Sequence, residues 1–302
     1  MKVLVTGASG FVGRWLHREL VSAGHEVVAA PPSAKVSVID FAAMRQVIDA
    51  AQPDAVAHLA AIAFGPDAAA DPERALQVNV RGTISLTQAI ADTHRRIPLF
   101  LASSSEVYGR PSEDELPLAE SAPLRPSSVY AVSKAAQEAV ALSAAFRLGL
   151  EVVVARSFNH TGPGQRTVFA VPAFIQRALA LESGKASEIR AGNLEVARDI
   201  GDVRDVVRAY RLLLENLVNS RGRSTPEIFN VATGRATAIR SIVESICEIV
   251  GVAPKIVTDL QLVRPDDPPL IVGNFNALRE ATGWEPRIAL KQTISDMVAA
   301  AR

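Results

Sequence analysis

The sequence predicts an α/β fold with a doubly wound parallel sheet and a smaller C-terminal α/β lobe. Two observations predict it. Short apolar runs alternate with amphipathic helical stretches through the first half of the chain, and a glycine-rich turn joins the first apolar run to the first helical stretch. A chain of 302 residues, 48% of them hydrophobic, is long enough to bury the core of such a fold.

The first unit of this fold lies at the N-terminus. Residues 2–6 are typical of a buried strand, residues 11–23 form a helical stretch, and Gly7, Gly10 and Gly13 lie at the turn between them. In this context Gly7 permits the tight turn and Gly10 lets the backbone approach a pyrophosphate. Gly13 leaves room where the helix meets the sheet, so the turn predicts phosphate binding at a helix N-terminus. The G-x-x-G-x-x-G spacing is one residue wider than the common fingerprint, and alone it also fits a plain strand–helix loop.

The remaining elements follow from the same periodicities. Strand-like runs lie at residues 26–30, 36–39, 55–59, 99–102 and 151–155, with helical stretches at 41–51, 72–93 and 130–148. Helical patterns return at 169–181, 202–217, 239–250 and 291–300, with short strands at 228–231 and 270–272. We expect a Rossmann NAD(P)-binding domain in 1–158, completed by sheet segments within 199–234 and 269–274. A substrate-binding lobe is expected in 159–198 and 235–302, with the substrate in the cleft between the two.

Composition narrows the class of partner. Lys+Arg and Asp+Glu both number 32, so no global field favours nucleic acid or an anionic membrane. The expected partner is a small molecule, with no nucleic acid and no membrane, and no metal site is expected. There is no apolar signal segment or membrane-length run, and Cys247 is the single cysteine, so cytoplasm is the expected compartment.

Tyr130 and Lys134 are candidates for acid catalysis. They are four residues apart at the start of a helical stretch, so their side chains share a face. A phenol is mostly protonated at neutral pH, and a nearby ammonium is expected to lower its pKa, which makes the pair a tunable proton donor. A serine after the strand at 99–102 lies at the sheet edge where ligands bind, and there it can hold the carbonyl oxygen that the tyrosine protonates.

Five motifs resemble the extended branch of the short-chain dehydrogenase/reductase superfamily, also called the nucleotide-sugar epimerase/dehydratase family. They are Thr6-Gly7 to Gly13, His58-Leu59-Ala60-Ala61, Asn79-Val80-Arg81-Gly82-Thr83, Ser103 to Gly109 and Tyr130-Ala131-Val132-Ser133-Lys134. The resemblance implies an NAD(P)-dependent oxidoreductase whose catalytic residues are Ser104, Tyr130 and Lys134. It implies cofactor binding by Tyr130 and Lys134 and by further residues along the first half of the chain, Gly7, Gly10, Phe11, Val12, Asp40, Leu59, Ala60, Ala61 and Asn79. Asp40 is also a natural helix N-cap, and His58 is expected to be a packing residue.

The C-terminal half most resembles a subfamily of reductases that convert GDP-4-keto-6-deoxy-D-mannose to GDP-D-rhamnose. The motifs are 156–165, 192–199, 202–205 and 262–265. Arg198 and Arg264 can converge on a diphosphate through charge-assisted bonds. The resemblance further implies substrate contacts from Ser105, Glu106, Asn159 and Asp267, the last at the nucleotide ribose.

Three alternatives stay open at this point. Glu106 lies where related GDP-mannose 4,6-dehydratases carry a base, although similar reductases also have a Glu there. A nucleotide-sugar 4-epimerase would keep its NAD bound and consume no reductant. A non-enzymatic NAD(P) sensor would need the glycine turn but not Ser104, Tyr130 and Lys134.

Cofactor preference and assembly are predicted less directly. The run Ala29-Ala30-Pro31-Pro32-Ser33 lacks the acid that bonds a ribose 2′-hydroxyl, and Arg14 and Lys35 can meet a 2′-phosphate. NADP(H) is therefore favoured slightly over NAD(H). The small apolar residues of 82–91 and 131–145 form the face that pairs two subunits in similar proteins, so a homodimer is expected.

Overall fold

The computed structural model describes residues 1–220, 225–253, 256–263 and 267–302. Its main sheet is entirely parallel, and its strand order is β2-β1-β3-β4-β5-β9. The bounds are β2 (Glu26–Ala29), β1 (Lys2–Thr6), β3 (Ala55–His58), β4 (Leu99–Ser104), β5 (Val152–Ser157) and β9 (Glu227–Val231). β2 lies on one side of β1, and β3 and the later strands lie on the other side. The carboxyl ends of β1 and β3 are therefore at the topological switch point where such sheets bind ligands.

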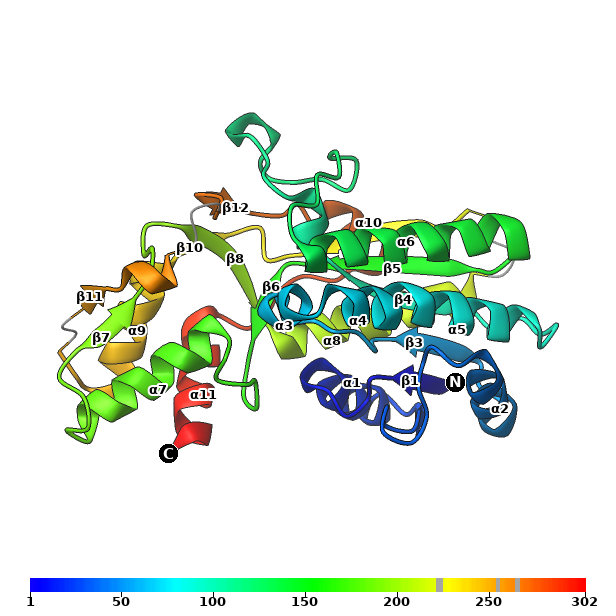
Figure 1. The fold of residues 1–302 in the computed structure, drawn as a ribbon, viewed down its shortest axis with the longest axis horizontal. Helices are drawn as coiled ribbons and strands as arrows, with labels where there is room; N and C mark the ends of the chain where they lie inside the picture. Colours follow the sequence, from blue (N-terminus) through cyan, green and yellow to red (C-terminus); the bar gives the residue numbers. More distant parts are fainter. Residues whose placement is uncertain (221–224, 254–255, 264–266) are drawn as a thin grey trace.

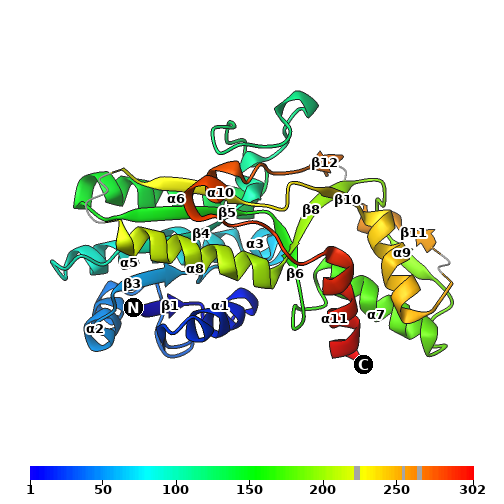
Figure 2. The ribbon, with the colours of Figure 1, turned by 180° about the vertical axis from the view of Figure 1, so that it is seen from behind.

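Helices cover both faces of this sheet (Figures 1 and 2). One face holds α1 (Phe11–Ser22) and α8 (Val203–Asn219), and the other holds α2 (Phe41–Ala51), α5 (Gly82–Ala91) and α6 (Val129–Leu148). Successive side chains of a strand point to opposite faces of the sheet, so each strand contributes to both hydrophobic cores. Val3 and Val5 of β1 pack in the cluster with α1 and α8, whereas Leu4 packs in the cluster with α2 and α5. The predicted doubly wound fold is thereby confirmed.

The C-terminal lobe has its own core. Residues of α7 (Ala170–Glu182), α9 (Ile239–Val250) and α11 (Leu290–Ala301) form one buried cluster, which Figure 1 shows at the end of the molecule away from the N-terminus. Two small sheets accompany them. β8 (Ala197–Asp202) pairs with β10 (Ala236–Ala238), β12 (Leu270–Ile271) and β6 (Asn159–Thr161), and β7 (Ile189–Ala191) pairs with β11 (Ile256–Thr258). The expectation that residues 269–274 complete the main sheet is wrong, because β12 pairs with β8 in a small sheet.

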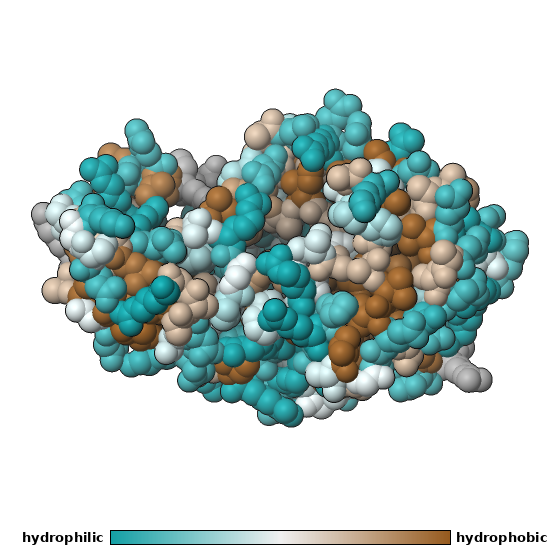
Figure 3. Space-filling view, turned by 90° about the horizontal axis from the view of Figure 1, so that it is seen from below, coloured by the Kyte–Doolittle hydropathy of each residue, from teal (hydrophilic) through white to brown (hydrophobic). Residues whose placement is uncertain are grey.

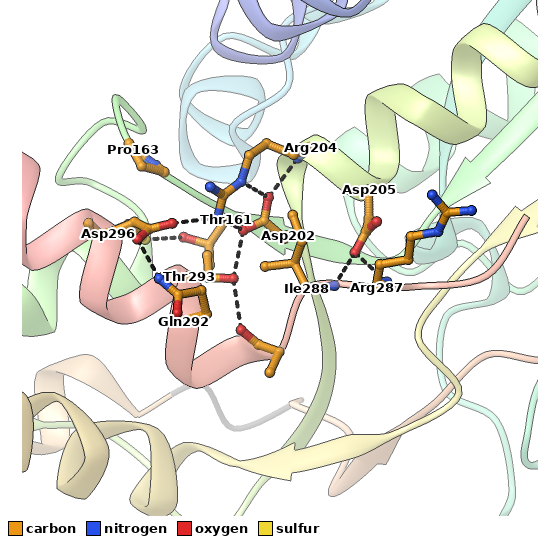
Figure 4. A network of polar contacts seen from close by, with 12 residues as sticks. Thr161, Pro163, Asp202, Arg204, Asp205, Arg287, Ile288, Gln292, Thr293 and Asp296 are labelled. Carbon is orange, nitrogen blue, oxygen red and sulfur yellow. Dashed lines mark hydrogen bonds and ion pairs between the residues drawn. The ribbon is translucent and has the colours of Figure 1, made fainter.

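Polar contacts join α11 to α8 at the junction of the two cores (Figure 4). Asp202, the N-cap of α8, accepts hydrogen bonds from the Arg204 guanidinium and from Thr293 Oγ1 of α11, the latter at 2.7 Å. Arg204 also pairs with Asp296 at 2.7 Å. In the first turn of α8, Asp205 accepts hydrogen bonds from the backbone N–H groups of Arg287 and Ile288. These bonds fix the C-terminal helix against the sheet domain.

Two sequence predictions of regular structure are wrong. Residues 36–39 form turns and no strand, because the run Val36 to Ile39 has no strand to pair with beyond β2. The predicted helix over 72–93 is divided into α4 (Pro72–Leu76), a π-helical turn (Gln77–Arg81) and α5. The π turn presents Asn79 inward, where its amide bonds the backbone of Ile62 and the Ser133 hydroxyl.

Short helices complete the chain. They are α3 (Gly65–Ala70), α10 (Asn276–Thr282) and three 3₁₀ segments, Ser105–Tyr108, Glu113–Glu115 and Leu260–Leu262. Seen from below, the surface is mostly hydrophilic, with a large hydrophobic patch on the half that holds the main sheet and a smaller one over the C-terminal lobe (Figure 3). None of the helices in the described ranges combines the length and apolarity that crossing a bilayer requires.

Candidate active site

The glycine turn is built for close backbone approach. Gly7 has φ +72, and a Cβ there would lie 2.7 Å from the Ala60 nitrogen. A Cβ on Gly13 would overlap the Gly7 carbonyl oxygen, so the helix can sit this close to the turn only without a side chain. The Gly10 N–H donates to the Gly7 carbonyl at 3.0 Å, which closes the turn.

The start of α1 fits the pyrophosphate of a dinucleotide. Its N-cap is Gly10, which offers no side-chain bond to the first N–H groups of the helix. Phe11 and Val12 follow in the first turn and are half-buried, with the Phe11 ring stacked 6.5 Å from that of His160. Backbone N–H groups and the helix dipole at this position favour a phosphate anion.

The residues after β3 lie beside this turn. Leu59, Ala60 and Ala61 are half-buried, and the Ala60 N–H donates to Thr6 Oγ1 at 3.2 Å. Asp40 caps α2 by accepting from the Ala43 N–H at 3.0 Å, which confirms its helix-capping reading. Its role in cofactor binding stays a prediction, as does that of the fully buried Asn79.

Ser104, Tyr130 and Lys134 are brought together by β4 and α6. Ser104 ends β4, and α6 begins at Val129, capped by the Ser128 hydroxyl on the Ala131 N–H. Tyr130 and Lys134 are buried on the helix face that covers the end of β4. The Tyr130 hydroxyl is hydrogen-bonded to Ser104, so the serine and the phenol share one locus at the carboxyl edge of the sheet.

Two hydrogen-bond acceptors hold the buried ammonium group of Lys134. Its Nζ donates to the Ala102 carbonyl at 2.6 Å and to Gln137 Oε1 at 2.7 Å. Burial lowers the pKa of Lys134 to about 8, and the nearby Glu138 carboxylate opposes that shift. The ammonium is therefore poised to exchange a proton near the working pH of most enzymes.

The pKa of Tyr130 departs from the sequence-based expectation. Burial raises this pKa, the Glu106 carboxylate raises it further, and the hydrogen bond with Ser104 only partly opposes them. The expectation that the Lys134 ammonium lowers this pKa is wrong for this structure, since burial outweighs the other influences and Lys134 bonds Ala102 and Gln137. The phenol is thus held in its protonated form, as a proton donor requires.

His58 is a packing residue, as predicted. Its ring lies between Thr6 Oγ1 at 2.7 Å and Thr83 Oγ1 at 3.1 Å, fully buried. Burial, assisted by the charge of Lys134, lowers the pKa of His58 to about 3, so the imidazole is neutral.

Two of the residues assigned to substrate contact each other. Arg198 of β8 forms an ion pair with Asp267, with 2.5 Å between Nη2 and Oδ1. Arg264 lies outside the described residues. Asn159 is exposed at the start of β6, next to the end of β5.

Ser105 and Glu106 open the 3₁₀ segment that follows β4. Ser105 is buried, whereas Glu106 is exposed and accepts a bond from the Ser128 hydroxyl at 3.4 Å. The Glu106 N–H donates to Ser104 Oγ at 3.2 Å. Both side chains thus adjoin the Ser104–Tyr130 pair.

Sequence reasoning missed the buried polar groups behind the catalytic residues. Glu138 accepts from the Arg156 guanidinium and from Ser103 Oγ, and Arg156 donates to the Tyr108 hydroxyl at 3.1 Å. Glu138 follows Lys134 by four residues, and that spacing on one helix face was the available signal. Gln137, which bonds Lys134, carried no comparable signal.

The cations considered for a 2′-phosphate are both exposed. Arg14 donates to the Ser9 carbonyl at 2.7 Å and to the Gly164 carbonyl at 3.4 Å, and so connects the turn to the C-terminal half. Lys35 lies in the segment after β2. Both cations lie near the end of the cofactor site where the adenosine is expected. This placement is compatible with NADP(H) and with NAD(H).

Comparisons with known sequences place the chain in a family of sugar-nucleotide enzymes. A family model described as GDP-mannose 4,6 dehydratase matches residues 33–297. GDP-6-deoxy-D-mannose reductase of Pseudomonas aeruginosa is 34% identical over 294 residues, covering 97% of this chain and 94% of that protein. GDP-6-deoxy-D-talose 4-dehydrogenase of Aggregatibacter actinomycetemcomitans is 29% identical over 298 residues, covering 97% of this chain and 95% of that protein.

Solved structures agree with these matches. RMD from Pseudomonas aeruginosa, complexed with NADPH, superimposes with a TM-score of 0.89 at 33% identity, covering 99% of this chain and 98% of that one. A UDP-glucose 4-epimerase of Thermus thermophilus, complexed with NAD, gives a TM-score of 0.84 at 28% identity, covering 99% and 98%. The fold is therefore shared along the whole length of the chain.

Proposed function

The chain belongs to the GDP-mannose 4,6-dehydratase family, and we propose that it is an NAD(P)H-dependent oxidoreductase of the extended short-chain dehydrogenase/reductase type. Its substrate is GDP-4-keto-6-deoxy-D-mannose, whose 4-keto group it reduces to form GDP-D-rhamnose. The observation that carries this proposal is the 34% identity to GDP-6-deoxy-D-mannose reductase over 97% of the chain. The grouping of Ser104, Tyr130 and Lys134 supports it, because a cofactor sensor has no use for a buried acid.

Three residues of the chain carry out the proton chemistry. Ser104 orients the C4 carbonyl through its hydroxyl, and Tyr130 donates its proton to the emerging alkoxide. Lys134 holds a positive charge beside the phenol and binds the nicotinamide ribose. The bound reduced nicotinamide supplies the hydride to C4. The raised pKa of Tyr130 keeps the proton available until the alkoxide forms.

The C-terminal lobe binds the sugar nucleotide. Arg198 meets the diphosphate, Asp267 holds the nucleotide ribose, and Asn159 positions the sugar. Ser105 and Glu106, next to Ser104, contact the hexose. Support comes from the placement of Asn159 after β5 and of Arg198 on β8, two neighbouring segments since β6 and β8 pair.

The turn and the residues after β3 bind the cofactor. Gly7, Gly10, Phe11 and Val12 surround the pyrophosphate, and Leu59 to Ala61 line the dinucleotide. NADPH is the favoured reductant, since no acid follows β2 and Arg14 and Lys35 are exposed nearby. A comparison structure, RMD, is complexed with NADPH.

A dehydratase is the second candidate. The Glu106 carboxylate is close enough to Tyr130 to raise its pKa, so it is available as a base toward a sugar bound there. The family model carries the dehydratase name. Such an enzyme would convert GDP-mannose to the 4-keto sugar without net consumption of reductant.

A homodimer and a domain division complete the proposal. The pairing face is formed by α5 and α6, where Ile84, Val132 and Phe146 are exposed apolar residues. Residues 1–158 with α8 and β9, both within 199–234, form the cofactor domain, and α7, α9 and α11 with the two small sheets form the substrate lobe. We place the enzyme in the cytoplasm, consistent with a single, buried cysteine.

One assay separates these readings. GDP-4-keto-6-deoxy-D-mannose is offered with NADPH or NADH, oxidation is followed by absorbance, and the product is identified by NMR. Oxidation with GDP-D-rhamnose formed is the expected result, and formation of the C4 epimer would correct the stereochemistry. Dehydration of GDP-mannose without such reduction would establish the second candidate, and interconversion of 4-epimers without reductant would establish an epimerase.

A further inference from the structure

A continuous hydrogen-bond chain runs beneath the candidate active site from the phosphate turn to Lys134. It starts at the Ala60 N–H, passes through Thr6, His58, Thr83 and Gln137, and ends at Lys134 Nζ. Thr6 and His58 come from the adjacent strands β1 and β3, Ala60 follows β3, and the other members come from the adjacent helices α5 and α6 (Figure 1). The site described above uses Lys134 but leaves the role of Gln137 unassigned.

Thr83 fixes the direction of the bonds on the Lys134 side. A hydroxyl has one proton, and that of Thr83 is donated to the Asn79 carbonyl at 2.7 Å. Thr83 Oγ1 can therefore only accept from Gln137, 3.0 Å away, so the NH₂ group of the amide must face Thr83. The amide oxygen of Gln137 then faces Lys134 Nζ at 2.7 Å and cannot be exchanged for the nitrogen.

The same argument fixes His58. Because Thr83 Oγ1 has no second proton, the His58 Nε2 atom at 3.1 Å must carry one and donate it. The opposite ring atom, Nδ1, accepts from Thr6 Oγ1 at 2.7 Å. Thr6 Oγ1 in turn accepts from the Ala60 N–H beside Gly7. The position of each proton in this hydrogen-bond chain is thereby fixed.

We propose that Gln137 is a positioning residue for Lys134, presenting a neutral acceptor of fixed orientation that holds the ammonium against the Ala102 carbonyl. With the nitrogen held at two points, one N–H of the ammonium remains for a third acceptor. The inference rests on the proposed function only in assigning Lys134 to the proton donor and the nicotinamide ribose.

Titratable groups on three elements, α6, β5 and β3, lie around Lys134. Glu138 on its own helix favours the ammonium, and its negative charge is shared with Arg156 of β5. His58 of β3 is neutral, and Tyr130 on α6 is protonated. A neutral amide at Gln137 thus completes the solvation of the ammonium without a second carboxylate, which would raise the pKa of Lys134.

Two substitutions with opposite electrostatics test this role. Gln137→Met keeps the length of the side chain but removes the acceptor, so the ammonium is disfavoured and the pKa of Lys134 falls. Gln137→Glu places a negative charge at the same point, so the pKa rises. Gln46→Met, at an exposed position of α2, is the matched control.

Two pH profiles report the pKa of Lys134. We expect both the reduction kcat/KM and the affinity for NADPH to fall as pH rises through the pKa of Lys134. The alkaline limb should move down by about one unit in Gln137→Met and up by about one unit in Gln137→Glu, while Gln46→Met follows the wild type. Loss of structure alone would move both variants the same way. The proposal would be overturned if the alkaline limbs of both Gln137 variants coincide with that of the wild type, or if both shift in the same direction.

The NADPH profile also separates this inference from the proposed function. If the wild type binds NADPH but fails to reduce the GDP-sugar, the proposed function fails, and the two opposed shifts in NADPH affinity still decide the role of Gln137.

A third measurement needs no cofactor. In histidine-labelled protein, ¹⁵N NMR distinguishes the two neutral tautomers of His58, and the chain requires the proton on Nε2. An Nδ1–H tautomer would require Thr83 to donate to His58 Nε2 in place of the Asn79 carbonyl, which would overturn the order of protons assigned to the chain.

Discussion

Arg198 and Asp267 form an ion pair with 2.5 Å between Nη2 and Oδ1. Arg198 also donates from Nη1 to the carbonyl of its neighbour Ala197 at 2.8 Å, so its guanidinium is oriented at both ends. Its side chain is only 11% exposed. A diphosphate would therefore meet an arginine that is already held in place, which reduces the side-chain entropy lost on binding.

Removing this guanidinium should weaken substrate binding selectively. We expect Arg198→Met to raise the KM for the GDP-sugar by about 10- to 100-fold, the range of one or two charge-assisted bonds. The Kd for NADPH, measured by fluorescence titration, should stay near the wild type. Arg240→Met is the control, since Arg240 forms an exposed ion pair with Glu195. Equal losses in both variants would argue against a diphosphate contact at Arg198.

The hydroxyl of Tyr130 should account for proton donation. Tyr130→Phe is expected to lower turnover by about 10²- to 10⁴-fold, because the alkoxide loses its acid, with NADPH affinity near the wild type. Tyr108→Phe removes the same atom from a buried hydroxyl that donates to Asn230 at 2.7 Å and accepts from Arg156 at 3.1 Å, and should cost about 2 to 3 kcal/mol of stability while turnover is kept. Steady-state kinetics measure the turnover of both variants, and thermal melts measure their stability. Unchanged turnover in Tyr130→Phe would rule out Tyr130 as the acid.

Local patterns predicted the fold well, and they predicted that Tyr130 and Lys134 share one face of a helix. α2 and α9 have the predicted bounds, because their amphipathic stripes begin and end with the helices. The shared face was predictable because a spacing of four residues on a helix survives any tertiary arrangement. The strand pattern predicted a serine at the sheet edge, and the family resemblance identified it as Ser104; the catalytic roles stay predictions.

Tertiary contacts explain what the sequence could not predict. β8 was missed because it reads Ala-Arg-Asp-Ile-Gly-Asp. The donors to its buried Asp199 are distant in sequence: the N–H groups of Thr233, Gly234 and Gly273 and the Thr233 hydroxyl. The partners of Lys134 were likewise hidden, since the Ala102 carbonyl belongs to another element. The raised pKa of Tyr130 depends on burial that composition does not report.

His58 should make the protein sensitive to acid. Its pKa is about 3 in the folded state and near 6.5 in an unfolded chain, so only the unfolded chain takes up its proton between these values. The contribution to stability is complete above the unfolded pKa and is lost as pH falls toward 3. We expect the melting temperature of His58→Gln to fall less than that of the wild type between about pH 7 and about pH 5. His17→Gln, at an exposed site of α1, should follow the wild type. Parallel slopes for all three proteins would contradict the buried neutral imidazole.

The exposed apolar face of α5 and α6 should mediate the homodimer. Val132 is 45% exposed on α6, which contacts α5, and a carboxylate at this position would have to be desolvated to enter an interface. Light scattering should give about twice the chain mass of 32.1 kDa for the wild type and the chain mass for Val132→Glu. Val21→Glu makes the same change at a valine that is 52% exposed on α1, and it should remain dimeric. A wild type that is monomeric, or a Val132→Glu protein that stays dimeric, would move the interface elsewhere or remove it. Because the same helix carries Tyr130 and Lys134 on its buried side, the monomeric variant also shows whether pairing of the subunits supports turnover.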